Sequence, residues 1–266
     1  MSKVNKYEDI IIKHYTNNYF EDERFYTPSH KIEYLTTMRY IKKFAKKGCK
    51  ILEIGAATGA YSIELAKMGF NVTAIELVAS NVEVMKKKSE GIKNITCLQG
   101  DALDLSRFSD NEFDIVLNLG PMYHIYTKKD KNKAIAETIR VCKTNGICMF
   151  AYLTHSSIVL NFGIRKNRFN ELEPILNKNG VIKDVPKEVF SSFHIEDFNK
   201  QFEKTNTTYI TNVATDGLFP TMKDYIDNDV MNEENYNKLV NWHFNVCERL
   251  DHQGLSSHML YICKKN

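Results

Sequence analysis

The stretch K-I-L-E-I-G-A-A-T-G, residues 50–59, decides the fold of this chain. The apolar run from Ile51 to Ile54 predicts a short strand, and the small residues after it predict a tight turn. An amphipathic segment begins at about Ala60 and predicts a helix. Glu53 therefore lies near the carboxyl end of a strand, which is the edge where open α/β sheets bind ligands.

The segments downstream repeat this order of strand and helix. Further strands are predicted at 71–76, 95–99, 113–119, 147–153, 209–214 and 258–263, and helices at 61–68, 81–89, 131–143 and 195–204. Such alternation is typical of a doubly wound, mostly parallel sheet with helices on both faces. The sequence thus predicts an α/β fold with seven strands.

We expect a single domain spanning residues 1–266. Residues 1–47 are predicted to form a helical cap, and 48–153 the ligand-binding core. Periodicity weakens over 154–193, and at the carboxyl side of a sheet such an insertion usually forms a lid. Residues 194–266 would complete the sheet, with a helical insertion at 217–257.

Composition limits the partners. A net charge of +3 with 26% charged residues lacks the basic excess expected of a nucleic-acid-binding protein. Apolar runs are too short to cross a membrane, and the amino end lacks a signal-peptide pattern, so we expect a cytoplasmic protein. Six cysteines form no C-x-x-C pair and are expected to be reduced core residues. The histidines show no ligand spacing, so no metal is expected.

Three acids follow three successive strands. Glu53, Glu76 and Asp101 each lie at the carboxyl end of a predicted strand. Glu76 is close to the spacing at which a ribose-binding carboxylate follows the first turn of a nucleotide fold. A pyrophosphate would be repelled by this set of acids, whereas a ligand with a positive centre and no phosphate would be favoured.

The chain resembles the class I S-adenosylmethionine-dependent methyltransferases, closely over residues 50–153 and loosely elsewhere. The first family motif matches Glu53 to Gly59, with Ala57 in place of the usual middle glycine. This resemblance implies a Rossmann-like sheet of seven strands whose last strand is antiparallel, with S-adenosylmethionine as cofactor and S-adenosylhomocysteine as product. It implies a cofactor site that comprises Glu53, Gly55, Ala56, Ala57, Gly59, Glu76, Leu77, Asp101, Ala102, Asn118, Leu119 and Gly120. Within that set, the turn lies beneath the methionine part, Glu76 binds the ribose, and Asp101 with Ala102 meets the adenine.

The fourth strand ends in Gly120-Pro-Met-Tyr-His124, where the methyl group should meet its acceptor. This run is similar to the Gly-Pro-Leu-Tyr-His stretch of a subgroup of bacterial small-molecule methyltransferases. Methyl transfer requires mainly in-line positioning, and a base is needed only when the acceptor must lose a proton. His124 is the candidate base, and Tyr123 the candidate residue for orienting the acceptor. A histidine that only packs in this turn is the alternative.

Aromatic residues in the amino-terminal helices offer a cover for the site. Tyr15 and Arg24 are candidates to reach over the ligand, although an ordinary aromatic core is the simpler interpretation. The predicted activity is methyl transfer to oxygen or nitrogen of a small molecule. An RNA or protein acceptor, which a basic groove beside Tyr123 would favour, and a non-catalytic nucleoside-binding protein stay open as alternatives. The sequence identifies neither the acceptor nor the oligomeric state.

Overall fold

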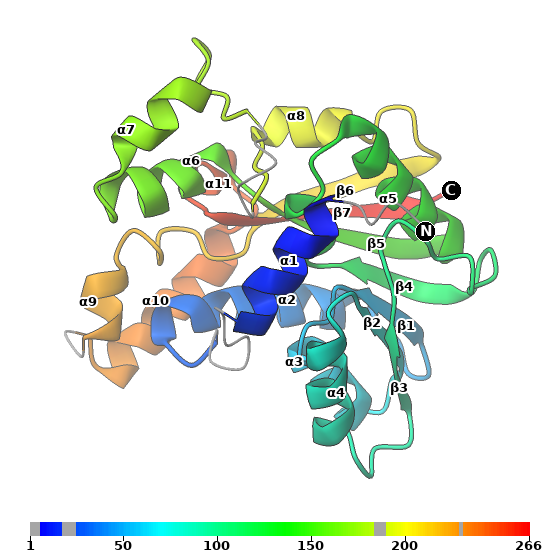
Figure 1. Ribbon diagram of the computed structural model, residues 1–266. Coiled ribbons are helices and arrows are strands. Elements are labelled where there is room, and N and C mark those ends of the chain that lie inside the picture. The colour runs from blue at the N-terminus through cyan, green and yellow to red at the C-terminus, as the bar shows by residue number, and fades with distance from the viewer. Residues whose placement is uncertain (1–5, 18–24, 184–189, 229–230) are drawn as a thin grey trace.

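The computed structural model describes residues 6–17, 25–183, 190–228 and 231–266, and is built around one seven-stranded sheet (Figure 1). The strands are β1 (Lys50–Ile54), β2 (Asn71–Glu76), β3 (Ile95–Gln99), β4 (Phe113–Asn118), β5 (Cys142–Leu153), β6 (Thr207–Ala214) and β7 (His258–Lys265). Their order is β3-β2-β1-β4-β5-β7-β6. The strand order reverses between β1 and β4, and such a switch point opens a crevice for ligands.

The pairing confirms the predicted fold class. β1 pairs in parallel with β2 and β4, while β7 runs antiparallel to both of its neighbours, β5 and β6. The last strand is therefore the antiparallel one, as in the Rossmann-like sheet of the predicted family.

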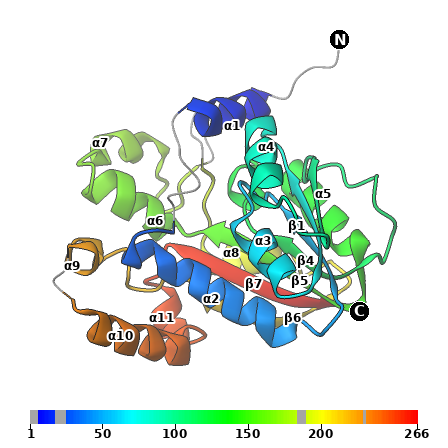
Figure 2. The same cartoon turned by 90° about the horizontal axis from the view of Figure 1, so that it is seen from below.

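Helices cover both faces of the sheet (Figures 1 and 2). α2 (Pro28–Phe44), α3 (Ala60–Lys67) and α4 (Ala79–Lys88) lie on one face, and α5 (Lys128–Val141) and α8 (Ile195–Lys200) lie on the other. α1 (Lys6–Asn17) lies across the edge formed by the strand ends, while α10 (Glu233–Val246) and α11 (Leu250–Gln253) lie beside α2. Within the described residues, no helix combines the length and apolar character required to cross a bilayer.

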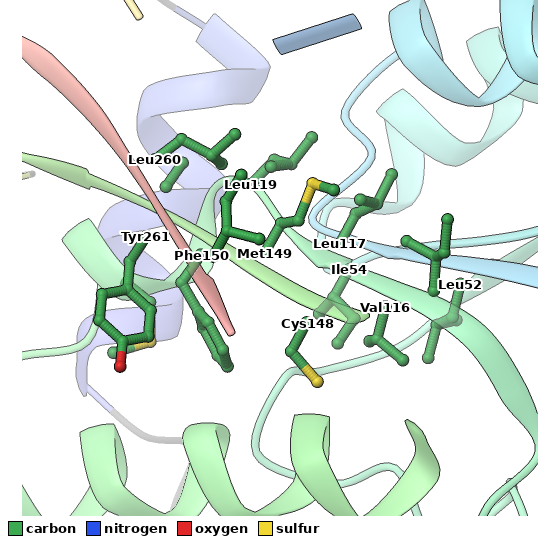
Figure 3. Close-up of a cluster of buried hydrophobic side chains, with 14 of the residues drawn as sticks. Leu52, Ile54, Val116, Leu117, Leu119, Cys148, Met149, Phe150, Leu260 and Tyr261 are labelled. Atoms are coloured by element: carbon green, nitrogen blue, oxygen red, sulfur yellow. The ribbon is translucent and has the colours of Figure 1, made fainter. Parts of the chain in front are cut away.

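Side chains of the central strands alternate between the two faces, as the period of two requires. Val116 and Cys148 point to one side and Leu117 and Met149 to the other (Figure 3). All four are fully buried, as expected for parallel strands covered on both sides. The face that carries Glu53 is thus fixed: it is the face of Leu117, its partner across the β1–β4 ladder.

The insertion after β5 is built from short pieces. It comprises α6 (His155–Ile158), a π-helical turn (Val159–Ile164), α7 (Phe169–Leu172) and a 3-10 turn (Glu173–Ile175), and it lies apart from the sheet (Figure 1). None of these pieces is long enough to show a sustained period, which explains why the sequence predicted only irregular structure here. Its role as a lid, like the division of the chain into parts, stays a prediction.

Several element boundaries differ from the sequence-based ones. The helix expected at 131–143 runs from Lys128 to Val141 because Thr127 caps it by accepting a hydrogen bond from the amide of Asp130. The strand expected at 147–153 begins at Cys142, with an irregularity in its pairing to β4. The helical insertion at 217–257 contains α9 (Lys223–Asp227) besides α10 and α11. All six cysteines are free thiols, four of them buried.

Candidate functional site

A first cavity lies at the carboxyl ends of β1, β2, β3 and β4, around the point where the strand order reverses. α1, α2 and the turns after these strands complete its wall. Its lining residues are Ile11, Tyr15, Phe25, Glu33, Thr37, Glu53, Gly55, Ala56, Ala57, Thr58, Ala60, Tyr61, Glu76, Leu77, Asn81, Gly100, Asp101, Ala102, Leu119, Gly120, Pro121, Tyr123, His124, Ile125, Ala151 and Thr215. The predicted turn and all three predicted strand-end acids therefore face one space.

The turn after β1 has a backbone that few residues accept. Gly55 has φ +76°, and a Cβ there would lie 2.8 Å from Cδ of Pro121, so this position brings the first and fourth strand ends together. Gly59 has φ +90° and opens α3. Ala57, where the family usually has glycine, also lies in the left-handed region with φ +48°. The family glycine thus occupies a position whose backbone is left-handed, and alanine adopts this conformation at a cost of about 1 kcal/mol.

Glu76 fixes this turn to the end of β2. Its Oε2 accepts the amide of Ala57 at 2.9 Å, and its Oε1 accepts the amide of Val78 at 2.9 Å. The carboxylate is held at both oxygens and still has lone pairs to offer to hydroxyl groups. Its orientation is therefore set before any ligand arrives.

Glu53 is an acid kept away from water. Its side chain is fully buried, and Ser62 of α3 donates a hydrogen bond to it. Burial raises the pKa of Glu53 to about 8, against the lowering effect of Ser62 and with a further rise from the charge of Glu76. A positive ligand group in the first cavity would favour the ionised form of this carboxyl.

The end of β3 contributes Asp101 and Ala102. Oδ1 of Asp101 accepts the amide of Leu103 at 3.0 Å, and Ala102 is buried in the wall. With Glu33 from α2, the first cavity has four carboxyl groups, and its described lining includes neither lysine nor arginine. A phosphate group would lack a positive partner among these residues.

The turn after β4 places an aromatic cluster at the mouth of the first cavity. The hydroxyl of Tyr123 donates to the carbonyl of Leu119 at 3.1 Å. The hydroxyl of Tyr15 in α1 lies 2.9 Å from Nε2 of His124, so α1 is joined to this turn. Phe190 stacks at a tilt on His124, with ring centroids 5.3 Å apart. Tyr15, Tyr123 and His124 thus meet at one place.

Asn118 does not join them. Its side chain is fully buried and donates to the hydroxyl of Thr138 in α5, and it is not part of the first cavity's lining. The cause is strand alternation: Asn118 faces α5, whereas the odd-numbered Leu117 and its partner Glu53 face α3. We therefore correct its expected role to one of packing. Arg24 lies outside the described residues.

A second cavity adjoins the first, and Tyr15 and Tyr123 line both. Its wall comes from α1, α2, the insertion after β5, α9 and the start of β7. The apolar lining residues are Leu153, Ile158, Phe162, Ile164, Leu172, Ile175, Ile182 and Phe190, and the basic ones Arg165, Lys166, Arg168, Lys183 and Lys223. Arg168 is paired with Glu171, and Lys166 lies over the Phe162 ring at 4.5 Å. The second cavity thus combines an apolar interior with positive charge.

Three residues that the sequence did not single out lie between the two cavities. Glu33 lines the first cavity, His258 lines the second, and the fully buried Asp216 holds His258. They come from α2, the segment after β6 and the start of β7. From the sequence, His258 was placed only as the first residue of the strand predicted at 258–263. The described residues contain no group of three or more His, Cys, Asp or Glu arranged to hold a metal ion.

Comparison with known proteins identifies the family of the middle part of the chain. Residues 52–150 match the family model described as "Methyltransferase domain". The matched range runs from β1 to β5 and includes Glu53, Glu76, Asp101 and His124.

Two relatives share this region. A ubiquinone biosynthesis O-methyltransferase of Rickettsia prowazekii is 27% identical over 171 residues, which are 62% of this chain and 66% of that protein. A demethylmenaquinone methyltransferase of Staphylococcus aureus is 33% identical over 105 residues, or 38% of this chain and 42% of that protein. The matches thus span less than two thirds of the length of these relatives.

A solved structure shares the fold over most of its length. A methyltransferase of Methanosarcina mazei, titled as dependent on S-adenosylmethionine, superposes with a TM-score of 0.57 at 18% identity, covering 85% of this chain and 96% of that one. At this identity the likeness concerns the fold.

Proposed function

Because the chain carries a class I S-adenosylmethionine-dependent methyltransferase domain, we propose that it transfers a methyl group from this cofactor to oxygen or nitrogen of a small molecule. In this proposal the cofactor binds in the first cavity and the acceptor enters the second. Tyr123, which lines both, marks the boundary where the methyl group is transferred.

The observation that carries the proposal is the charge of the first cavity. Four carboxyl groups line it, and its described lining contains no lysine or arginine. A cofactor with a sulfonium centre, an ammonium group and no phosphate fits such a wall, whereas a dinucleotide requires positive partners for its phosphates. The turn also fits, because Gly55 leaves no room for a side chain between the two strand ends.

The predicted cofactor residues receive the following roles in this proposal. Glu76 accepts the ribose hydroxyls with a carboxylate already held by two amides. Asp101 and Ala102 meet the adenine, while Leu77 and Leu119 supply apolar contact. Glu53 lies near the positive groups, directly or through water. The turn residues Gly55, Ala56, Ala57 and Gly59 and the strand-end residue Gly120 let the backbone approach the methionine part.

The bound cofactor supplies an activated methyl group whose sulfur is already a good leaving group. The chain's own residues then hold the acceptor in line, exclude water and handle a proton where one must leave. The apolar interior of the second cavity suits the body of a small aromatic or aliphatic acceptor. Phenols come first in a screen, because one relative is named as an O-methyltransferase of ubiquinone biosynthesis and a hydroxyl on an aromatic ring is a phenol.

An RNA acceptor is the second candidate, because Arg165, Lys166 and Lys183 give the second cavity a basic rim. These exposed side chains would contact phosphates along a strand. A small anionic acceptor would bind to the same positive charges. The size of the methylated product distinguishes an RNA acceptor from a small one.

The test has two parts. S-adenosylhomocysteine at millimolar concentration should raise the melting temperature, because a ligand of the native state alone stabilises it. Radiolabelled methyl transfer should then be measured with a panel of phenols, amines and carboxylated aromatics and with total RNA. A missing thermal shift would refute the cofactor assignment. Binding without any methylated product would favour a nucleoside-binding protein, and label in RNA the second candidate.

A further inference from the structure

Asp216 is a buried carboxylate surrounded by donors. Its Oδ1 accepts the hydroxyl of Ser256 at 2.6 Å and the amides of Ser257 and His258 at 2.8 and 3.0 Å. Its Oδ2 lies 2.9 Å from Nδ1 of His258. Burial alone would raise the pKa of Asp216. The hydrogen bonds from His258, the charge of His258 and the hydrogen bond from Ser256 outweigh burial, so the pKa of Asp216 is lowered. The carboxylate is therefore ionised at neutral pH and can only accept hydrogen bonds.

An acceptor on one ring nitrogen determines the chemistry of the other. Because Asp216 only accepts, Nδ1 of His258 must carry a proton, and the neutral ring then has an unprotonated Nε2. The backbone is fixed as well, since Thr215 donates both its amide and its hydroxyl to the carbonyl of His258, at 3.0 and 2.9 Å. The histidine thus has a set tautomer and a set position.

His258 lies where an acceptor would be held. It lines the second cavity, and its ring centroid is 6.5 Å from that of Tyr123. Oε2 of Glu33, which lines the first cavity, lies 3.7 Å from its Nδ1. Besides Asp216 and Glu33, the titratable groups around His258 in the second cavity's wall are His14, Tyr15, His30, Tyr123, Glu171, Lys223, Asp224 and the basic residues of the insertion. A protonated His258 would have two negative partners on its Nδ1 side.

We propose that His258 is the catalytic base for the methyl acceptor and that Asp216 is its positioning residue, an inference that rests on the proposed function. A lone pair of the acceptor oxygen or nitrogen forms the new bond to the methyl carbon. The electron pair of the breaking bond between carbon and sulfur stays on sulfur, which becomes a neutral thioether. The acceptor's proton moves to Nε2 of His258, and the imidazolium that results is stabilised by Asp216 and Glu33.

The arrangement differs from that of His124, the base expected from the sequence. Nε2 of His124 lies against the hydroxyl of Tyr15, and three aromatic rings of Tyr15, Tyr123 and Phe190 contact its ring. His258, by contrast, is held through its Nδ1 by the carboxylate of Asp216. His124 is therefore assigned to closing the site through α1, and His258 to the proton.

The first test reads the tautomer directly, without an acceptor. Histidine nitrogen NMR of the full chain with S-adenosylhomocysteine should give His258 a protonated Nδ1 and an unprotonated Nε2 at neutral pH. His258→Gln identifies the signals by removing them. In Asp216→Asn the amide can donate, so the Nε2-protonated tautomer should appear. A wild-type ring protonated on Nε2 alone would overturn the proposal.

The second test uses the phenols that are methylated in the screen. His258→Gln should lower kcat about 100-fold or more at neutral pH, while KM and the affinity for S-adenosylhomocysteine change less than about threefold. The loss should shrink above the phenol's own pKa, where no base is needed. His194→Gln, outside both cavities, is the matched control. A kcat within threefold of wild type would overturn the proposal. A missing thermal shift with S-adenosylhomocysteine would instead refute the proposed function, so the two failures are distinguishable.

Discussion

The two cavities are built in different ways. Most of the first cavity comes from the ends of four parallel strands and the turns that directly follow them, within residues 53–125. The second takes its wall from α1, α2, the insertion after β5, α9 and β7, which are far apart in the chain. A site made of strand ends is determined by local geometry, whereas a site made of insertions depends on how distant segments pack. Changes to the strand-end acids of the first cavity should therefore act on ligand affinity, and changes to the segments packed behind the second cavity on the stability of the fold.

Loss of the Glu76 carboxylate should produce the largest effect and would define the first cavity most directly. Glu76→Ala removes two charge-assisted bonds to the turn together with the acceptors proposed for the ribose. We expect the affinity for S-adenosylhomocysteine to fall by about 100-fold or more, measured by calorimetry. Glu83→Ala, an exposed acid of α4, should leave it unchanged. An affinity within threefold of wild type would remove Glu76 from the site.

Acid should weaken the scaffold behind the second cavity. His243 of α10 is buried, and its Nδ1 lies 3.2 Å from Nε2 of His252. Burial and then the charge of His252 lower the pKa of His243 to about 4. In the unfolded chain this histidine takes up a proton near pH 6.5, whereas in the folded chain it does so only near pH 4. The free energy of unfolding is therefore highest above pH 6.5 and falls as the pH is lowered from 6.5 toward 4. The loss should reach roughly 3 kcal/mol at the acid end.

Urea unfolding at a series of pH values checks this window. His243→Gln should flatten the dependence of the unfolding free energy on pH between 6.5 and 4, and His194→Gln should not. An equally steep curve in His243→Gln would show that other groups cause the acid loss. Gly217, which follows Asp216, packs against both histidines, because a Cβ there would lie 2.5 Å from Nε2 of His252. The acid-sensitive pair is thus in contact with the segment that positions His258.

The sequence predicted the sheet and the first cavity because their signals are local. Glu53, Glu76 and Asp101 each follow an apolar run, and a parallel sheet brings such ends together without further information. The sequence did not show on which face of the sheet Asn118 lies. A strand that is buried on both sides is apolar on both faces, so its pattern does not show which helix a residue contacts. The contact between Asp216 and His258 joins the two sides of a long insertion. No spacing rule reaches across those residues, and only the antiparallel pairing of β6 with β7 brings the two together.

The protonation state of Glu53 tests how the first cavity differs from the second, because it couples the charge of the first cavity to ligand binding. With a pKa of about 8, the buried carboxyl is largely protonated at neutral pH and should lose its proton when a cation binds. Affinity for S-adenosylmethionine should then rise roughly tenfold from pH 6.5 to 8 and level off above. Calorimetry in buffers of different ionisation enthalpy counts the released proton. Glu53→Gln removes the titrating carboxyl but leaves the titration of the ligand unchanged, so it should abolish the part of the pH dependence of affinity that Glu53 causes. An unchanged pH dependence in this variant would contradict the role assigned to Glu53.

Ala57→Gly should have the smallest effect, and it separates backbone strain from ligand contact in the first cavity. Glycine relieves the left-handed φ of +48° but loses more entropy on folding, so we expect a gain below about 1 kcal/mol in unfolding free energy. Affinity for S-adenosylhomocysteine should change less than threefold, because the amide that donates to Glu76 is retained. Ala56→Gly is the matched control: Ala56 is buried and lacks a positive φ, so glycine there should destabilise. A destabilised Ala57→Gly would mean that the alanine methyl packs in the turn and that this packing outweighs the backbone strain.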